Sequence, residues 1–499
     1  MLINLYRMDE KSQNIDANQD EIKNDTNKYI FWRINENGSV KILPSKVYEL
    51  LQVNGVAKYY PDEKRKDTKP IYVLIRDKII EPVGKDFMVT LCKRFIDYTN
   101  PPEEMKNSII DALHRSMSIF SESNQYLLIT AKIDIVRDTA DKSYFFFRNS
   151  AVKVTADNIE MVPYIKLDGY VWKSNIIDSD IKLLDSQIVI KDSVFMHFLS
   201  DITRKADDPK ANALRIGHLF SLIGYLLHRH KNQSNARAVI IMDENPTFSA
   251  DGGTGKSLIF KAIGKVRLVI VEDGRNFDPG GRFAFQHVDE SADIFLIDDA
   301  AANFNFEKIF PFITEDFPVE VKFKTRRVIP FLDAPKIALT TNYSIKGIGG
   351  SYSRRKYEYE ISAYYGDGYS PETKYKQIFF QDWDETQWNL FYNTMLLAAK
   401  FYLENGIILS EPLNLKRTHL INSTCEEFAD FADEHINLNQ EYNKRVVLED
   451  FKRLYQGYES LTSRNFTRWM KSYASIMGYK TNERRSDADY FIEFKPKEG

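Results

Sequence analysis

Ser249-Ala-Asp-Gly-Gly-Thr-Gly-Lys-Ser257 follows an apolar run, Ala238–Met242, and precedes a segment of helical spacing that begins at Leu258. This order of strand, glycine-rich loop, Lys-Ser pair and helix is typical of a nucleoside-triphosphate site. Glycines let backbone N–H groups turn toward the phosphates, and the N-terminus of the helix favours negative charge. The full pattern has a glycine where this chain has Ala250, so the loop predicts the site without deciding it.

The side chains at the end of this loop have separate roles in such a site. The ammonium group of Lys256 is expected to reach the β- and γ-phosphates, and the hydroxyl of Ser257 is expected to bind Mg²⁺. ATP and Mg²⁺ are therefore the predicted cofactors. The residues predicted to hold the nucleotide are Gly252, Gly253, Thr254, Gly255, Lys256 and Ser257.

A second apolar run, residues 293–300, reads Asp-Ile-Phe-Leu-Ile-Asp-Asp-Ala. It has the character of a buried parallel strand that ends in two carboxylates. Phosphoryl transfer needs one acid to hold Mg²⁺ and a second group to orient or deprotonate the attacking water. We expect Asp298 to bind the metal and Asp299 to act on the water; the alternative is a strand that ends in a solvated acidic turn.

A third apolar strand, residues 335–342, reads Pro-Lys-Ile-Ala-Leu-Thr-Thr-Asn. Asn342 could hydrogen-bond the γ-phosphate or the attacking water if this strand lies beside the Asp298 strand. Strands also end in Asn simply to begin a turn, so the motif depends on its order and spacing.

Together these segments resemble the A, B and C motifs of superfamily 3 helicases, the ring-forming motors of small DNA viruses, phages and plasmids. The matching residues are Gly-Gly-Thr-Gly-Lys-Ser257, Ile-Asp-Asp-Ala300 and Leu-Thr-Thr-Asn342, and the resemblance covers residues 210–400. It implies an AAA+-like P-loop NTPase domain of α/β class. It also implies a homo-oligomeric ring of six subunits that hydrolyses ATP between subunits and moves 3′ to 5′ on single-stranded DNA.

The segment between the second and third motifs, Val319–Arg327, resembles the family's DNA-gripping β-hairpin. It contains Lys322, Lys324, Arg326 and Arg327, and alternating cations on a strand lie on one side of it. Phosphates of the DNA backbone are the expected target of these cations. The alternative is an edge strand that lysines protect against aggregation.

Ser351-Tyr-Ser-Arg-Arg355 resembles the family segment that carries the arginine finger. Arg354 or Arg355 is expected to reach the γ-phosphate bound by a neighbouring subunit, where a cation offsets charge in the transition state. The alternative is an ordinary basic turn before the strand Lys356–Ile361. A finger that acts on a neighbour makes oligomerisation part of the mechanism.

Composition agrees with a folded, DNA-binding protein of about three domains. The 499 residues are 43% hydrophobic and 28% charged with a net charge of −3, so DNA binding must come from local patches. Cys92 and Cys425 are too few for a zinc cluster or a disulfide scaffold, and a cytoplasmic location is the default expectation. We find no apolar run of the roughly 18–20 residues that span a membrane.

The patterning predicts four segments. Residues 1–28 are polar and expected to be flexible, 29–200 form an α+β accessory domain, 201–415 form the ATPase, and 420–499 form a small winged-helix domain. In the accessory domain we expect a hairpin at Asn37-Gly38, a helix over 86–98, and strands 71–75, 144–148 and 151–155, the last two paired with a short third strand at 170–172. A helix over 203–231 precedes the phosphate loop, and 382–406 forms a closing helix.

Two other activities find little support in the N-terminal half. A primase-polymerase would need clustered carboxylates, and Asp134 is a lone acid. A rolling-circle nickase would need a His-apolar-His pair, and His228-Arg-His230 has a charged centre. We interpret this triplet as cations that favour the C-terminus of a helix.

The C-terminal segment has the order of a winged helix. Helices are predicted at 424–436, 446–455 and 463–477, the last beginning at Ser463 as N-cap and ending at Gly478. A charged turn at 482–487 then separates two strands. The residues expected to contact DNA are Arg464, Arg468, Trp469, Lys471, Arg484 and Arg485; the alternative is a protein-docking winged helix.

The sequence therefore predicts an ATP-dependent DNA helicase of a phage, prophage or plasmid replication system. Its expected partners are single-stranded or forked DNA, copies of itself, and a primase, polymerase or loader. One alternative is an origin-binding initiator that uses ATP as an assembly switch, and another is a bifunctional primase-helicase.

Overall fold

The computed structural model describes residues 27–60, 70–205, 208–244, 254–301, 303–322, 326–343, 345, 350–366, 368–410, 412, 414–486 and 489–496. The chain divides into two compact units. The first comprises residues 1–136, 146–151 and 161–179, and the second comprises 137–145, 152–160 and 180–499. Residues 180–200, expected in the accessory domain, thus group with the segments predicted to form the ATPase. The expected flexible segment 1–28 lies outside the described residues except for its last two. Within the described ranges, no helix is both long and apolar enough to span a membrane.

The first unit is built on a four-stranded sheet in the order β3-β4-β5-β9 and a separate hairpin, β1-β2. The hairpin turns at Gly38, whose φ of 78° is accessible to glycine without steric strain, so the expected Asn37-Gly38 turn is confirmed. Apolar residues of α2, α3 and α4 pack against the hairpin and the sheet, in a core that includes Phe31, Phe95 and Leu113. The elements are β1 (Trp32–Ile34), β2 (Val40–Ile42), α2 (Pro44–Val53), β3 (Val56–Tyr59), β4 (Ile71–Arg76), β5 (Ile79–Pro82), α3 (Lys85–Thr99), α4 (Glu103–Arg115), α5 (Glu122–Gln125) and β9 (Val171–Trp172).

A second four-stranded sheet has the order β10-β6-β7-β8. Its strands are β6 (Lys142–Phe147), β7 (Ala151–Thr155), β8 (Ile159–Val162) and β10 (Ile176–Ile177). The expected pairing of the first two is confirmed. The expected third partner at 170–172 is wrong, because β9 pairs with β5 in the other sheet. Two-residue strands carry no periodicity that could assign a partner.

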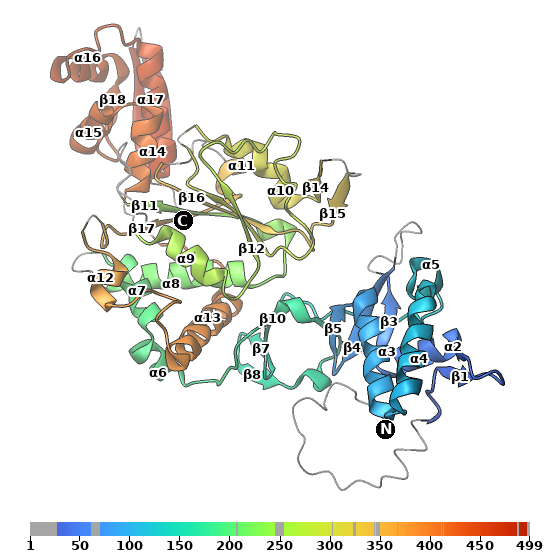
Figure 1. Cartoon of the computed structure of the whole chain (residues 1–499). Helices are drawn as coiled ribbons and strands as arrows, with labels where there is room; N and C mark the ends of the chain where they lie inside the picture. Colours follow the sequence, from blue (N-terminus) through green and yellow to red (C-terminus); the bar gives the residue numbers. More distant parts are fainter. Residues whose placement is uncertain are drawn as a thin grey trace. The chain divides into compact units, whose positions relative to one another are not determined.

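The second unit is centred on a five-stranded sheet in the order β12-β13-β16-β11-β17, and all four strand pairs are parallel (Figure 1). The strands are β11 (Ala238–Asp243), β12 (Val269–Asp273), β13 (Ile294–Asp298), β16 (Lys336–Thr341) and β17 (Lys356–Ile361). The middle strands are buried along almost their whole length, because other elements cover both faces, whereas the edge strand β12 is half exposed. Burial on both faces explains why these strands are continuously apolar in the sequence.

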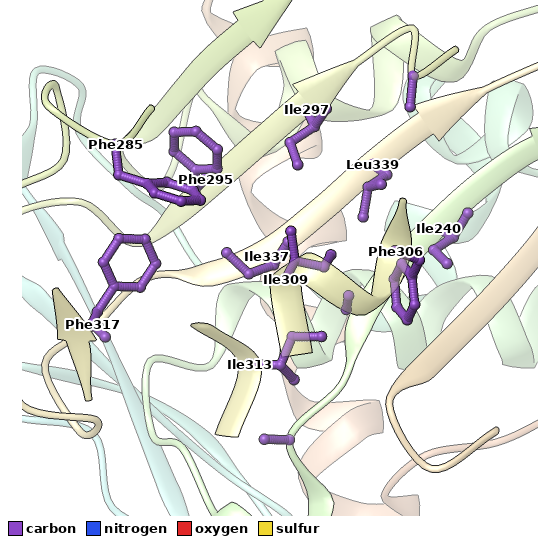
Figure 2. Packing of buried hydrophobic residues seen from close by; sticks show 14 of the residues in the cluster. Ile240, Phe285, Phe295, Ile297, Phe306, Ile309, Ile313, Phe317, Ile337 and Leu339 are labelled. Carbon is purple, nitrogen blue, oxygen red and sulfur yellow. The ribbon is translucent and has the colours of Figure 1, made fainter. Parts of the chain in front are cut away.

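One face of this sheet packs against a phenylalanine- and isoleucine-rich layer. Ile240, Ile297 and Leu339 point to the same side, toward Phe306 and Ile309 (Figure 2). The covering segments are α10 (Phe310–Thr314) with the turn before it and the hairpin of β14 (Phe317–Val319) and β15 (Arg327–Ile329).

The opposite face is covered by α8 and α9, with α13 packed along α8 (Figure 1). Asp208 caps α8 by accepting from the Ala211 N–H, and Asp384 caps α13 by accepting from the Gln387 N–H. Gly224 lets the two long helices approach, since a Cβ there would lie 2.2 Å from the Ala398 carbonyl oxygen. The helices are α6 (Ser186–Asp192), α7 (Val194–Ile202), α8 (Pro209–Leu227), α9 (Lys256–Ile263), α11 (Gly350–Ser353), α12 (Pro371–Tyr375) and α13 (Glu385–Asn405).

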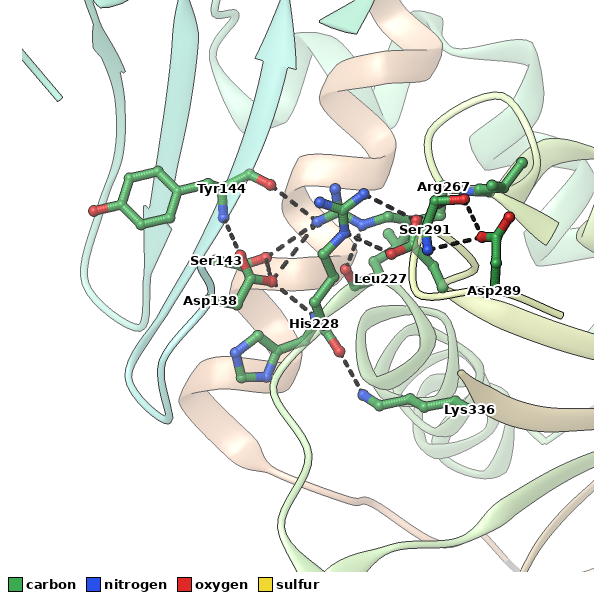
Figure 3. A network of polar contacts seen from close by, with 12 residues as sticks. Asp138, Ser143, Tyr144, Leu227, His228, Arg267, Asp289, Ser291 and Lys336 are labelled. Atoms are coloured by element: carbon green, nitrogen blue, oxygen red, sulfur yellow. Dashed lines mark hydrogen bonds and ion pairs between the residues drawn. The ribbon is translucent and has the colours of Figure 1, made fainter. Parts of the chain in front are cut away.

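A buried polar network lies at the start of β13 and β16 (Figure 3). Asp138 accepts from Ser143 Oγ at 2.7 Å and from the Tyr144 and Arg229 N–H groups at 2.8 Å, and its carboxylate is 3.8 Å from the Arg267 guanidinium. Burial opposes ionisation of Asp138, but Arg267 and the other donors outweigh it and lower the pKa of this carboxyl. The segment 137–145 is thus connected to the rest of the second unit by a fully partnered charge.

His228 shows that the predicted cation triplet is partly wrong. Burial, reinforced by Lys336, lowers the pKa of His228 to about 4, so this ring is neutral at ordinary pH. Its Nε2 contacts the Thr139 carbonyl oxygen at 2.7 Å. The C-terminal carbonyls of α8 accept instead from Lys336 Nζ, which the sequence places over a hundred residues away.

Residues 415–496 have a core of their own around Phe428, Phe451 and Phe466. Three predicted helices are present, followed by two long strands within a three-stranded sheet of order β18-β20-β19. Thr462, not Ser463, caps the last helix by accepting from the Asn465 N–H, and Gly478 ends it with φ 81°. The predicted charged turn is also wrong, because most of it belongs to β19. The elements are α14 (Leu415–Ser423), α15 (Glu426–His435), β18 (Glu441–Asn443), α16 (Lys444–Leu454), α17 (Ser463–Met477), β19 (Tyr479–Ser486) and β20 (Asp489–Pro496).

Candidate functional site

Three neighbouring strands of the parallel sheet end in polar residues at the same edge. β11 ends at Asp243, β13 ends at Asp298, and β16 is followed directly by Asn342. Met242 is in register with Thr341, so Asp243 lies level with Asn342; Ile297 is in register with Leu339, so Asp298 lies level with Thr340, two residues before Asn342. The expectation that the Asn342 strand lies beside the Asp298 strand is confirmed. In open parallel sheets, ligands bind at this carboxyl edge.

Lys256 points to the same edge from the first turn of α9. Its Nζ lies 2.6 Å from Asn342 Oδ1 and 3.5 Å from Thr254 Oγ1, and it forms an ion pair with Asp243. Only 12% of the Lys256 side chain is exposed. Two predicted site residues, Lys256 and Asn342, are thus in direct contact although they are 86 positions apart.

The two acids of β13 are held by a residue that the sequence analysis did not select. Thr340 is buried, and its hydroxyl donates to Asp298 Oδ1 at 2.5 Å while it accepts from the Asp299 N–H at 2.7 Å. Asp299 has φ 60°, a left-handed conformation that Asp tolerates better than most residues. The sequence signal for Thr340 is the Thr-Thr pair that directly precedes Asn342.

The turn after β12 approaches these acids closely. The Gly274 N–H donates to the Asp298 carbonyl oxygen at 2.6 Å, and a Cβ on Gly274 would lie 2.8 Å from backbone atoms of Ala300. The next residue, Arg275, donates three hydrogen bonds to Asp273, two from its guanidinium and one from its backbone N–H. The guanidinium hydrogen bonds raise the pKa of Arg275, and Asp299 and Asp298 contribute to a smaller extent, which places a cation within electrostatic reach of both acids.

Of the predicted phosphate loop, the structure describes the residues from Thr254 onward. Gly255 has φ 108° and faces the Phe198 ring, so it is the position where the chain turns into α9. Ser257 lies exposed in the first turn of α9. Gly252 and Gly253 lie outside the described residues. The Ser257 hydroxyl and the Asp298 carboxylate are hard oxygen donors and suit Mg²⁺, which keeps several ligands from water and phosphate. In the described part of the chain, no group of three or more His, Cys, Asp and Glu forms a metal cluster.

The predicted hairpin is present, with Phe317–Val319 antiparallel to Arg327–Ile329. Lys322 and Arg326 are exposed near its tip, and Lys324 lies outside the described residues. Arg327 turns inward and donates to the Val288 carbonyl oxygen. Binding of DNA by Lys322, Lys324 and Arg326 stays a prediction.

Arg354 and Arg355 have different surroundings. The Arg355 guanidinium stacks over the Phe310 ring at 4.7 Å, and its Nη1 donates to the Ser351 carbonyl oxygen at 3.2 Å. Arg354 is exposed in the turn before β17. Of the two finger candidates, Arg354 is therefore the more exposed.

The basic residues of the C-terminal segment fall into two groups, one exposed and one paired with glutamates. Arg464 and Arg468 are exposed on α17. Lys471 pairs with Glu483 at 2.7 Å, and Arg484 donates two hydrogen bonds to Glu441 at 2.5 and 2.6 Å. Arg484 was expected in a turn, but it lies in β19 with its charge already compensated, so it is a weaker candidate for DNA contact.

No family model matches the chain, and no curated protein matches it. Similar solved structures include two of the same region. One, described as the A form apo structure of the NrS-1 C-terminal region, has a TM-score of 0.37 and 13% identity over 90% of this chain and 98% of that chain. The other, an A form apo structure of the same region, has a TM-score of 0.38 and 12% identity over 90% and 99%. Superposition at this level shows neither the fold nor the function of this chain.

Proposed function

We propose that the chain is an ATP-dependent DNA helicase of superfamily 3 type from a phage, prophage or plasmid replication system. One observation supports this proposal above all. Lys256 Nζ contacts Asn342 Oδ1 at 2.6 Å, and the buried Thr340 hydroxyl joins the Asn342 strand to Asp298 and Asp299. A lysine, two acids and an amide at the carboxyl edge of a parallel sheet form the set that phosphoryl transfer requires.

Each residue has a defined task in the proposed reaction. Lys256 binds the β- and γ-phosphates and offsets their charge, and Asn342 orients the γ-phosphate or the attacking water. Asp299 accepts a proton from that water or fixes its direction. Mg²⁺, when bound, neutralises charge on the phosphate oxygens, and Ser257 and Asp298 are the residues that would hold it.

DNA binding and ring formation complete the proposal. We propose that the hairpin binds the phosphates of one DNA strand inside a ring through Lys322, Lys324 and Arg326. Because the net charge of the chain is −3, DNA is attracted only by local basic patches of this kind. Arg354 is proposed to act on the nucleotide of the neighbouring subunit. The C-terminal segment is proposed to be a winged helix that contacts DNA through Arg464 and Arg468.

The first test is ATP hydrolysis with and without single-stranded DNA. Lys256→Ala and Asp299→Asn are each expected to lower the rate about 100-fold or more. Asparagine is chosen at position 299 because it accepts positive φ. Lys261→Ala is the matched control, because Lys261 lies exposed on the same helix. This variant should hydrolyse ATP at the rate of the wild type.

A mixing experiment tests the arginine finger. Lys256→Ala and Arg354→Ala subunits should each be inactive alone, and their mixture should regain activity because some interfaces then combine an intact lysine with an intact arginine. Failure to regain activity would remove Arg354 from the mechanism.

The initiator alternative is supported by the exposed arginines of the C-terminal segment, since a separate DNA-contacting module suits sequence recognition. ATP binding with slow turnover indifferent to DNA, together with a sequence-specific footprint lost in Arg468→Ala, would favour the initiator over the helicase.

A further inference from the structure

Asp243, the last residue of β11, occupies the proposed nucleotide site without a role in the mechanism above. Its Oδ2 pairs with Lys256 Nζ, the group proposed to bind phosphates. Only 13% of the Asp243 side chain is exposed. The contact is therefore a charge-assisted hydrogen bond largely shielded from water, a strong class of polar contact.

The second carboxylate oxygen of Asp243, Oδ1, does not contact Lys256 through a hydrogen bond. Within the described part of the chain, Oδ1 is buried and has no hydrogen-bond partner. Buried carboxylate oxygens are normally satisfied, so an unpaired one beside a proposed ligand site needs an explanation. A structural carboxylate would have both oxygens satisfied by the fold, whereas among the described residues Asp243 is satisfied on one side only, by the proposed phosphate-binding lysine.

We propose that Asp243 is a positioning residue that takes the place of phosphate on Lys256 when the site is empty and must release the lysine when a polyphosphate binds. This inference rests on the proposed ATP site. It assigns Asp243 a second effect, which is to make affinity depend on the number of phosphates. A ligand without phosphates does not need the lysine, so Asp243 does not oppose it.

The size of the effect follows from the population of the contact. If about nine in ten empty molecules have Lys256 held by Asp243, the apparent affinity for a ligand that needs the free lysine falls about tenfold. Repulsion between Asp243 and phosphate adds to this, because the carboxylate remains close after it releases the lysine.

The test is binding of a fluorescent ATP analogue to the full chain, with ATP, ADP and adenosine as competitors. Asp243→Asn keeps the shape and removes the charge; Asp243→Ser is a second, shorter variant. Glu244→Gln is the matched control, because Glu244 is the next residue and carries the same charge. Its Oε2 accepts from the Ala363 N–H at 3.1 Å, a bond that glutamine retains. Thermal unfolding of every variant is followed in parallel.

Asp243→Asn is expected to bind ATP about tenfold more tightly, ADP with a smaller gain, and adenosine as the wild type does. An equal change for all three ligands would mean a purely structural role. An equal gain in ATP affinity in Glu244→Gln would mean that any loss of negative charge near the site strengthens binding. Weaker ATP binding in Asp243→Asn would mean that the carboxylate helps to bind the nucleotide. Each of these results overturns the inference. If the wild type and all variants bind no nucleotide, the proposed function itself fails.

Discussion

Thr340→Val is the substitution that most directly tests how the acidic edge is held. Valine has nearly the shape of threonine but lacks the hydroxyl that serves both acids. The substitution removes the donor to Asp298 Oδ1 at 2.5 Å and the acceptor of the Asp299 N–H at 2.7 Å. Thr340 is only 2% exposed, so water cannot take the place of its hydroxyl, although Asp298 and Asp299 themselves are partly open to solvent.

The magnitude follows from these two bonds. A hydrogen bond to a charged group contributes about 1.5–3 kcal/mol, and a buried N–H without a partner costs about 1–3 kcal/mol. Since Asp298 is half exposed and regains some hydration, we expect a local loss of about 2 kcal/mol or more. This corresponds to roughly 30-fold easier opening of the turn. Thr340→Ser keeps the hydroxyl and loses one methyl group, which costs about 0.8 kcal/mol.

Two assays separate these variants. Amide hydrogen exchange of a peptide spanning residues 298–300 should be about 30-fold faster in Thr340→Val and at most about fourfold faster in Thr340→Ser, with a peptide from α13 as the internal reference. ATP hydrolysis should need more Mg²⁺ in the valine variant because Asp298 is no longer oriented. Equal exchange and equal Mg²⁺ dependence in the two variants would refute the reasoning.

Three further outcomes follow from the described contacts. Gly274→Ala should displace the acidic turn and lower both stability and activity, because its Cβ would lie 2.8 Å from backbone atoms, whereas Gly366→Ala, with open space around it, should be neutral by thermal unfolding and ATP hydrolysis. Asp138→Asn should destabilise the second unit by about 3–5 kcal/mol in urea unfolding, since it leaves a buried arginine uncompensated, while exposed Asp141→Asn should not. Burial, helped by the neighbouring arginine, lowers the pKa of His218 to about 3. The unfolded chain therefore binds a proton that the folded chain refuses, and His218 by itself should lower stability below pH 6.5 by at most about 1.4 kcal/mol per pH unit; His218→Gln should remove this share of the slope and leave the share of buried His228.

The sequence predicted secondary structure best where the residues of a single strand, turn or helix end determine its conformation. The buried strands that end at Asp298 and Asn342 were predictable because helix-covered parallel strands are continuously apolar. The turn at Gly38 and the end of α17 at Gly478 were predictable because few residues accept positive φ. Lys256 could be placed at the start of a helix because of the glycine run before it.

Pairings between distant segments were beyond such reasoning. The contacts of Thr340 with Asp298, of Asp243 with Lys256 and of Lys336 with the end of α8 depend on strand order, which local periodicity does not encode. The cap of α17 was misplaced by one residue because Thr462 and Ser463 are both suitable caps and only the backbone conformation distinguishes them.

The geometry of the edge also weighs against the simpler interpretation of Asp298 and Asp299 as a solvated acidic turn. A solvated turn needs no buried hydroxyl, yet Thr340 satisfies both residues from inside the sheet. It needs no left-handed aspartate, yet Asp299 has φ 60°, and the Gly274 backbone packs against the same turn where no side chain fits. Conformations of this kind persist where the surroundings enforce them, and they concentrate at functional sites. Three independent constraints on two adjacent acids, beside a buried lysine, therefore favour a site that fixes the direction of its carboxylates for a ligand.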